Sequence, residues 1–221
     1  MNYLLLDTSN KPMSLAVMQD DNVLIEHTTN LKRNHSIQLM PAIQNILQEA
    51  NIDKKDIDAI ITAKGPGSYT GLRIGVTTAK TLAYALQTDL YGVSSLAALA
   101  AVMPDIKEGL LIAPVMDARR EAVYTGVYRY TEGQLESVLD DQYMTIEDLN
   151  MYLNESEQDY VFVGNDLEKV EPLLDGKVII TLPQAHKMKS LINQPENIHT
   201  FKPDYLKLSE AERNWLNNQK S

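Results

Sequence analysis

Apolar and polar positions along the first hundred residues predict alternating strands and helices. Three short apolar runs, at 3–9, 13–19 and 22–28, are separated by turn-forming sequences, which is typical of an antiparallel meander. The elements expected after this meander are a helix over 36–50, a buried strand over 57–64, a helix over 72–86, a strand over 89–93 and a helix over 95–103.

The second half repeats this order. The strands expected first lie over 109–118, 121–130 and 133–139. Thr145 then opens a helix, with Asp148 three residues later completing a capping box. The remaining expected elements are a strand over 160–165, a helix over 167–174, a strand over 177–182, a helix over 185–192 and a last helix that begins at Ser209.

The repeated order predicts two similar α/β lobes, each a mixed sheet flanked by helices. Breaks near Pro104 and Pro203 suggest a first lobe over 1–104 and a second over 105–203. We expect the last helix, within 204–221, to pack back on the first lobe.

Composition narrows the function. The 221 residues carry a net charge of −10 and include no cysteine, which excludes disulfides, zinc–thiolate sites and thiol catalysis. An acidic chain gains little counterion release on phosphate, so a partner should supply most of the positive charge for any nucleic acid. The sequence has no signal peptide and no apolar run long enough to span a membrane, so we expect a cytoplasmic protein without membrane association.

The glycine-rich stretch "KGPGSYTGLRIG" over 64–75 does not fit the familiar phosphate motifs. A P-loop requires lysine after its last glycine, and here Leu72 follows Gly71. The dinucleotide-binding pattern is one residue shorter than the spacing of Gly65, Gly67 and Gly71. A nucleophile elbow requires glycine where Pro66 stands.

Two interpretations of this stretch remain. We favour a strand-to-helix turn in which glycines allow close backbone approach and Ser68 or Thr70 caps the helix. The alternative is an anion or nucleotide contact at the helix N-terminus, formed by Asp7, Gly65, Gly67 and Ser68.

Other candidate sites carry weaker signals. The four histidines form no helical pair that could hold a metal. Asp7 and Asp117 end corresponding strands and could hold Mg²⁺ together, but we favour a role in capping their hairpin turns. Arg119 and Arg120 form either an anion contact or a solvated turn.

Two helices have more apolar surface than one core requires. Besides its core face, the helix over 72–86 has a second, uncharged face formed by Ile74, Thr78, Thr81 and Ala85. The helix over 36–50 has an apolar arc wider than the usual core stripe, which includes Leu39, Met40, Ile43 and Leu47. These eight residues are the predicted protein interface, unless the second lobe covers both helices.

Four motifs in register resemble the TsaB (YeaZ) family over nearly the whole chain. They are "LLLDTSNKPMSLAVMQDDNVL", "HSIQLMPAIQNIL", "GPGSYTGLRIGVTTAKTLAYAL" and "PVMDARREAVY". The resemblance implies an actin/Hsp70-like (ASKHA) fold of two ribonuclease-H-like lobes. It also implies a pseudoenzyme, because Ser95 and Leu99 stand where the catalytic paralogue TsaD has two metal-binding histidines.

The resemblance further implies a non-catalytic subunit that binds and activates TsaD for threonylcarbamoylation of the tRNA adenosine next to the anticodon. The expected partners are TsaD, a TsaE-type ATPase, a second copy when the chain is alone, and tRNA mainly through the complex. We expect no metal and no cofactor of its own, with ATP or ADP at the complex junction. The alternatives are a glycoprotease-like peptidase and a stand-alone actin/Hsp70-type ATPase, although the turn after Asp7 has no glycine for phosphate.

Overall fold

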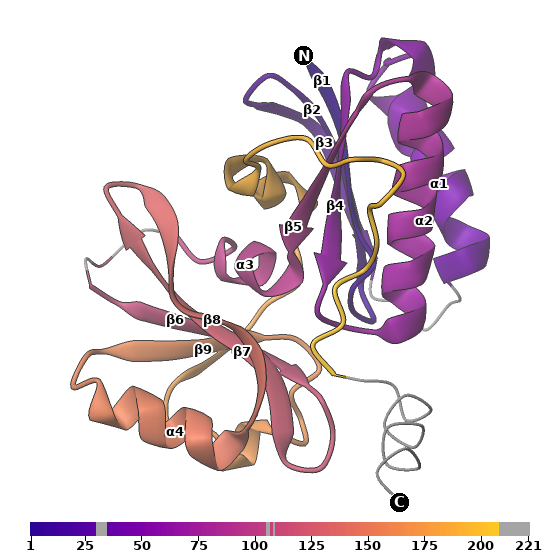
Figure 1. Cartoon of the computed structure of the whole chain (residues 1–221). Coiled ribbons are helices and arrows are strands. Elements are labelled where there is room, and N and C mark those ends of the chain that lie inside the picture. Colours follow the sequence, from indigo (N-terminus) through magenta and orange to yellow (C-terminus); the bar gives the residue numbers. More distant parts are fainter. Residues whose placement is uncertain (30–34, 105–106, 108, 208–221) are drawn as a thin grey trace, which may run out of the picture.

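The computed structural model describes residues 1–29, 35–104, 107 and 109–207. Two five-stranded mixed sheets form two lobes, with helices packed on their faces (Figure 1).

The first sheet is built around β1 (Asn2–Asp7), which is buried on both faces. On one side β1 pairs antiparallel with β2 (Met13–Gln19), and β2 pairs with β3 (Asn22–Thr29) at the edge. On the other side β4 (Ala59–Gly65) runs parallel to β1, and β5 (Asp89–Ser94) runs parallel to β4. The predicted meander and the buried strand that follows it are confirmed.

The second sheet repeats this topology. Its strands are β6 (Leu111–Asp117), β7 (Ala122–Thr131), β8 (Gln134–Thr145), β9 (Tyr160–Gly164) and β10 (Val178–Ile180). The spatial order is β10-β9-β6-β7-β8, against β3-β2-β1-β4-β5 in the first sheet. In each sheet the first strand is central, the next two extend it on one side and the last two on the other. This duplicated mixed sheet is the ribonuclease-H-like lobe of the actin/Hsp70-like fold, as expected.

Helices α1 (His35–Glu49) and α2 (Tyr69–Leu86) cover one face of the first sheet (Figure 1). Alternate side chains of β1 point to opposite faces, as the pleat requires. Leu4 and Leu6 pack with α1 and α2, whereas Tyr3 and Leu5 belong to the core on the other face.

Helix α3 (Ser95–Ala100) joins the lobes. Ala98 packs into the core of the first sheet, whereas Leu96 and Leu99 pack with side chains of the second sheet. The opposite face of the second sheet is covered by α4 (Ile146–Glu155). A short helix therefore contributes to both cores and fixes the position of one lobe against the other.

Two expected helices are wrong in type. The stretch 167–174 contains only a 3₁₀ turn, η2 (Glu171–Leu173). The stretch 185–192 forms a 3₁₀ helix, η3 (Ala185–Leu191). A further 3₁₀ turn, η1 (Lys54–Asp56), precedes β4. The first lobe holds the start of η3, because the Ser14 hydroxyl accepts from the Ala185 amide at 3.0 Å and Glu26 accepts from the His186 amide at 3.1 Å.

The chain returns to the first lobe after β10. Ala185 and Met188 pack on the first sheet, and Phe201 lies in the core beneath α1 and α2. Lys80 of α2 donates to the carbonyl oxygens of His199 and Phe201 at 2.9 and 3.1 Å. The residues over 185–201, placed in the second lobe by the sequence boundary, thus pack with the first, and the last helix expected lies outside the described residues.

Candidate functional site

The predicted interface residues of α1 mostly form the base of a groove. Leu39, Ile43 and Leu47 are only 1%, 2% and 8% exposed, and they pack into the core of their own lobe. Met40 is 43% exposed. An apolar groove of about 420 Å³ runs here between α1 and the C-terminal half of α2; Met40, Ile43 and Leu47 line it together with Leu82 and Leu86. The interface assignment is therefore corrected for Leu39, which faces only the core.

The predicted second face of α2 lies outside the core except for Ile74, which packs against the core of the first lobe. Thr81 and Ala85 are exposed, and Ile74 and Thr78 are half-buried. Tyr84, which is 66% exposed, adds an aromatic ring beside them. No acidic residue occurs in α2, so this face offers a partner an uncharged surface of small side chains.

The glycine-rich loop is filled by the chain itself. A Cβ at Gly67 would overlap the carbonyl oxygen of Ser9, and one at Gly71 would overlap that of Thr8. A Cβ at Gly65 would overlap the carbonyl oxygen of Asp204, and Gly65 and Gly67 have φ values of +130° and +154°. Only glycine permits this approach of three backbone segments.

Hydrogen bonds confirm that the loop is a strand-to-helix turn. The Ser68 hydroxyl caps α2 by accepting from the Gly71 amide at 3.3 Å. The Ser68 amide donates to the Ser9 carbonyl at 2.7 Å, and the Thr8 hydroxyl donates to the Gly71 carbonyl at 2.8 Å. The amide of Ser68, which an anion would need, is thus already bonded to the β1–β2 turn.

Asp7 and Asp117 each cap a hairpin turn, as favoured from sequence. Asp7 accepts from the Ser9 amide at 2.8 Å, and Asp117 accepts from the Arg119 amide at 2.7 Å. Burial raises the pKa of the Asp7 carboxyl, although hydrogen bonds from Ser9 and the charge of His35 oppose that shift. Within the residues described, no three of the usual metal-ligating side chains gather in one place.

Ser95 and Leu99, where the resemblance implies that metal-binding histidines are missing, serve packing. Leu99 is 2% exposed and lies in the core between α3 and the second sheet. Ser95 is 1% exposed, and its hydroxyl accepts from the Gly65 amide at 3.1 Å. Neither side chain can coordinate a metal as an imidazole does.

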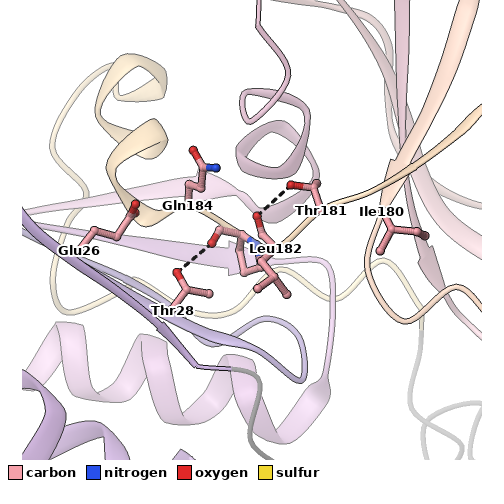
Figure 2. Close-up of a pocket in the computed structure, with 7 residues that line it drawn as sticks. Glu26, Thr28, Ile180, Thr181, Leu182 and Gln184 are labelled. Atoms are coloured by element: carbon pink, nitrogen blue, oxygen red, sulfur yellow. Dashed lines mark hydrogen bonds between the residues drawn. The ribbon is translucent and has the colours of Figure 1, made fainter.

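A second cavity, of about 550 Å³, lies where the chain crosses back to the first lobe (Figure 2). It is lined by Glu26, Thr28, Ile180, Thr181, Leu182, Pro183 and Gln184. Two of its polar side chains are engaged with protein: Thr28 donates to the Pro183 carbonyl at 3.2 Å (Figure 2), and Glu26 binds the His186 ring nitrogen at 2.9 Å. This cavity therefore offers little for ligand recognition.

A partly buried carboxylate at the lobe junction was not anticipated. Asp141 of β8 accepts from Ser94, which caps α3, and from the hydroxyl of Tyr128 on β7. Burial raises the pKa of Asp141 and of Tyr128. The sequence offers no signal for this contact, because Ser94 and Asp141 are 47 residues apart.

A contact between α2 and the last described segment was also missed. Arg73 lies 4.3 Å from the ring centre of Tyr69, and its Nε donates to the Tyr205 hydroxyl at 3.2 Å. The rings of Tyr69 and Tyr205 stack with centres 4.9 Å apart. No helix in the described part of the chain combines the length and apolarity needed to cross a membrane.

Comparison with known proteins agrees with this architecture. A family model described as "TsaD: tRNA N6-adenosine threonylcarbamoyltransferase" matches residues 22–215. A Bacillus subtilis (strain 168) protein, described as tRNA threonylcarbamoyladenosine biosynthesis protein TsaB, is 41% identical over the full length of both chains. The Escherichia coli (strain K12) protein of the same description is 29% identical over 85% of this chain and 84% of its own.

A solved structure gives the same result. YeaZ from Pseudomonas aeruginosa superimposes with a TM-score of 0.80 at 27% identity, covering 93% of this chain and 99% of its own. The chain therefore belongs to the TsaB (YeaZ) family of tRNA threonylcarbamoyladenosine biosynthesis proteins.

Proposed function

We propose that this chain is a non-catalytic subunit that binds and activates a TsaD-type catalytic subunit for threonylcarbamoylation of the tRNA adenosine next to the anticodon. The observation that carries the proposal is the uncharged outer face of α2, together with the apolar groove beside it. A helix facing only water would carry charged side chains there.

The shape of this surface suits a helical partner. The base of the groove is apolar, and its rim carries the polar side chains of Gln44, Gln48 and Asp53. An apolar centre with a polar rim is the usual anatomy of a protein interface. We infer that a catalytic subunit of the same fold would present an equivalent pair of helices, so that one surface could accept either a second copy of this chain or TsaD.

The packing of the glycine loop supports a role without chemistry. The carbonyl groups of Thr8 and Ser9 pack directly against Gly71 and Gly67, so the loop is in contact with the β1–β2 turn. Leu99 is buried in the core at a position where the paralogue has a metal ligand. We infer that the loop supports α2, and through α2 the interface.

The wider assembly follows from this role. We propose that a TsaE-type ATPase joins the complex, that ATP or ADP binds at the junction of subunits rather than in this chain, and that the protein works in the cytoplasm. In this scheme the chain has no cofactor of its own.

Binding to the catalytic subunit tests the proposal. Ile74→Glu and Thr78→Arg each place a charge on the half-buried face of α2, so the affinity for a TsaD-type subunit should fall at least about tenfold. Gln158→Arg adds the same positive charge as Thr78→Arg, at an exposed position of the second lobe, and should bind normally. Isothermal calorimetry and sedimentation measure both. Unchanged affinity of folded Ile74→Glu and Thr78→Arg would reject the interface.

A further inference from the structure

Four cations gather along one border between the lobes, although the chain is strongly acidic. Arg119 and Arg120 lie exposed in the β6–β7 turn, Arg73 is exposed near the start of α2, and Lys207 belongs to the last described segment. Within the described part of the chain, none of them has a carboxylate oxygen within 4.0 Å. Their charges are thus available to a partner.

Tyrosine rings lie beside these cations. Arg73 lies over Tyr69, which is 48% exposed and stacks on Tyr205, 39% exposed. The Lys207 ammonium lies 4.4 Å from the ring centre of Tyr143, which is 38% exposed. Half-exposed rings paired with cations are suited to stacking on bases.

The two groups form one continuous surface. Tyr205 and Lys207 are separated by a single residue, and the Lys207 ammonium donates to the Ala118 carbonyl at 3.2 Å, directly before Arg119. Figure 1 shows this last segment running down along α2 towards the second lobe. The surface, defined by Tyr69, Arg73, Arg119, Arg120, Tyr143, Tyr205 and Lys207, is named the basic–aromatic border.

The turn that presents the two arginines has an unusual backbone. Arg119, Arg120 and Glu121 have φ values of +68°, +59° and +55°. Each non-glycine residue in this region costs about 1–2 kcal/mol, so three in succession are retained against a free-energy cost. Asp117 stabilises the turn by accepting from the Arg119 amide at 2.7 Å.

We propose that the basic–aromatic border is a tRNA contact of this chain, with arginines on the phosphate backbone and tyrosines stacked on unpaired bases. The proposal rests on the proposed function, because it assumes that the bound RNA is the substrate of the assembled complex. It revises the expectation that a partner supplies most of the positive charge. The acidic remainder of the surface repels RNA and orients it onto the border.

The extent of the surface favours RNA over a small anion. The cations come from α2, the β6–β7 turn and the last segment, so they are spread along the surface rather than converging on one point. Cations distributed along a track, with aromatic rings between them, match a nucleic-acid backbone with exposed bases. An acidic protein segment would pair with the same arginines, but contacts with the tyrosine rings would add less to its binding free energy.

Salt-dependent binding of an unmodified tRNA transcript tests the proposal. Affinities of the full chain, alone and with its TsaD-type partner, are measured by fluorescence anisotropy between about 0.05 and 0.3 M salt. Arg119→Gln/Arg120→Gln should lower affinity at least about tenfold at 0.1 M salt and reduce the log–log salt slope by about 1.5. Lys169→Gln/Lys177→Gln removes the same charge at exposed positions near the opposite sheet edge and should match wild type.

A substitution that removes a negative charge makes the test stricter, because the expected change in affinity has the opposite sign. Glu121→Gln removes the negative charge from the same turn, so it should strengthen tRNA binding severalfold. Tyr205→Leu should weaken binding without changing the salt slope, since it removes stacking and no charge.

These measurements distinguish a failure of the proposed tRNA contact from a failure of the proposed function. If the arginine double variant binds TsaD normally and binds tRNA with wild-type affinity and slope, the tRNA contact is wrong while the subunit role stands. If it loses TsaD and keeps tRNA affinity when tested alone, the border is a protein interface and the proposal is overturned. Failure of the wild-type chain to bind TsaD would reject the proposed function, and the measurement on the chain alone would still decide the RNA contact.

Discussion

Replacing Gly71 by alanine tests whether the glycine loop is packed architecture or an open ligand site. Gly71 lies in the first turn of α2, and an added Cβ would come closer than 3.0 Å to the Thr8 carbonyl oxygen, a separation that real Cβ atoms do not show. The helix and the β1–β2 turn would have to separate by roughly 1 Å. Thr8 is 1% exposed, so surrounding core must move with it.

Two opposing effects set the magnitude. Overpacking a dense region costs about 1–3 kcal/mol, whereas alanine in place of glycine stabilises a helix by up to about 1 kcal/mol. We expect a net loss of about 1–2 kcal/mol in the free energy of unfolding. For a chain of this size that is a fall in Tm of about 2–8 °C. Gly75→Ala should also destabilise the fold, because its new methyl group meets the Thr8 hydroxyl, which would have to give up its hydrogen bond to the Gly71 carbonyl.

Thermal and urea unfolding followed by circular dichroism measure these changes. Thr70→Ala, at an exposed position in the same helical turn, adds no atom near Thr8 and should stay within about 0.5 kcal/mol of wild type. A Gly71→Ala variant as stable as wild type, or more stable, would refute the reasoning. It would show that the Thr8 carbonyl is not held against the helix and that the loop has room for a ligand.

Two further predictions concern the lobe junction and the returning segment. Burial raises the folded-state pKa of Asp141, so protonated Asp141 favours the folded state. This contribution to the free energy of unfolding is complete below the ordinary pKa of 3.8 and is lost as pH rises through the raised pKa. The stability of Asp141→Asn relative to wild type, measured by urea unfolding, should therefore increase between about pH 4 and pH 7, and a pH-independent difference would contradict this. Phe201→Ala should cost about 3–5 kcal/mol in the same assay, because the ring is 6% exposed in the core of the first lobe, whereas the exposed Lys202→Ala should cost little. A loss below about 1 kcal/mol for Phe201→Ala would show that the returning segment is not packed as described.

Much of the fold could be predicted because its signals are local. The apolar runs of β1, β2 and β4 are bounded by turn residues, and Ser68 stands where a helix cap is required. The expected strand over 133–139 is shorter than β8 (Gln134–Thr145), whose later residues are held by pairing with β7 rather than by their own pattern. The short helices expected after β9 became 3₁₀ turns because long-range contacts hold them.

The candidate site could be predicted only where the helix face itself carries the signal. Helical periodicity alone defines the uncharged face of α2, so the exposure of Thr81 and Ala85 could be predicted, whereas their role in an interface stays a prediction. The wide apolar arc of α1 did not show which of its residues face the core and which face outward. Leu39 packs in the core of its own lobe. Ser9 and Asp204 contact the glycine loop from segments that are far from it in the chain. Hydrophobic periodicity gives no information about such long-range contacts.

The most direct test of the account is reconstituted tRNA modification with purified TsaD-type and TsaE-type subunits, with this chain included or omitted. Formation of threonylcarbamoyladenosine, followed by mass spectrometry of digested tRNA, should require the chain, and Ile74→Glu should reduce it in proportion to lost binding. Modification at the full rate without the chain would contradict the claim that it is an activating subunit.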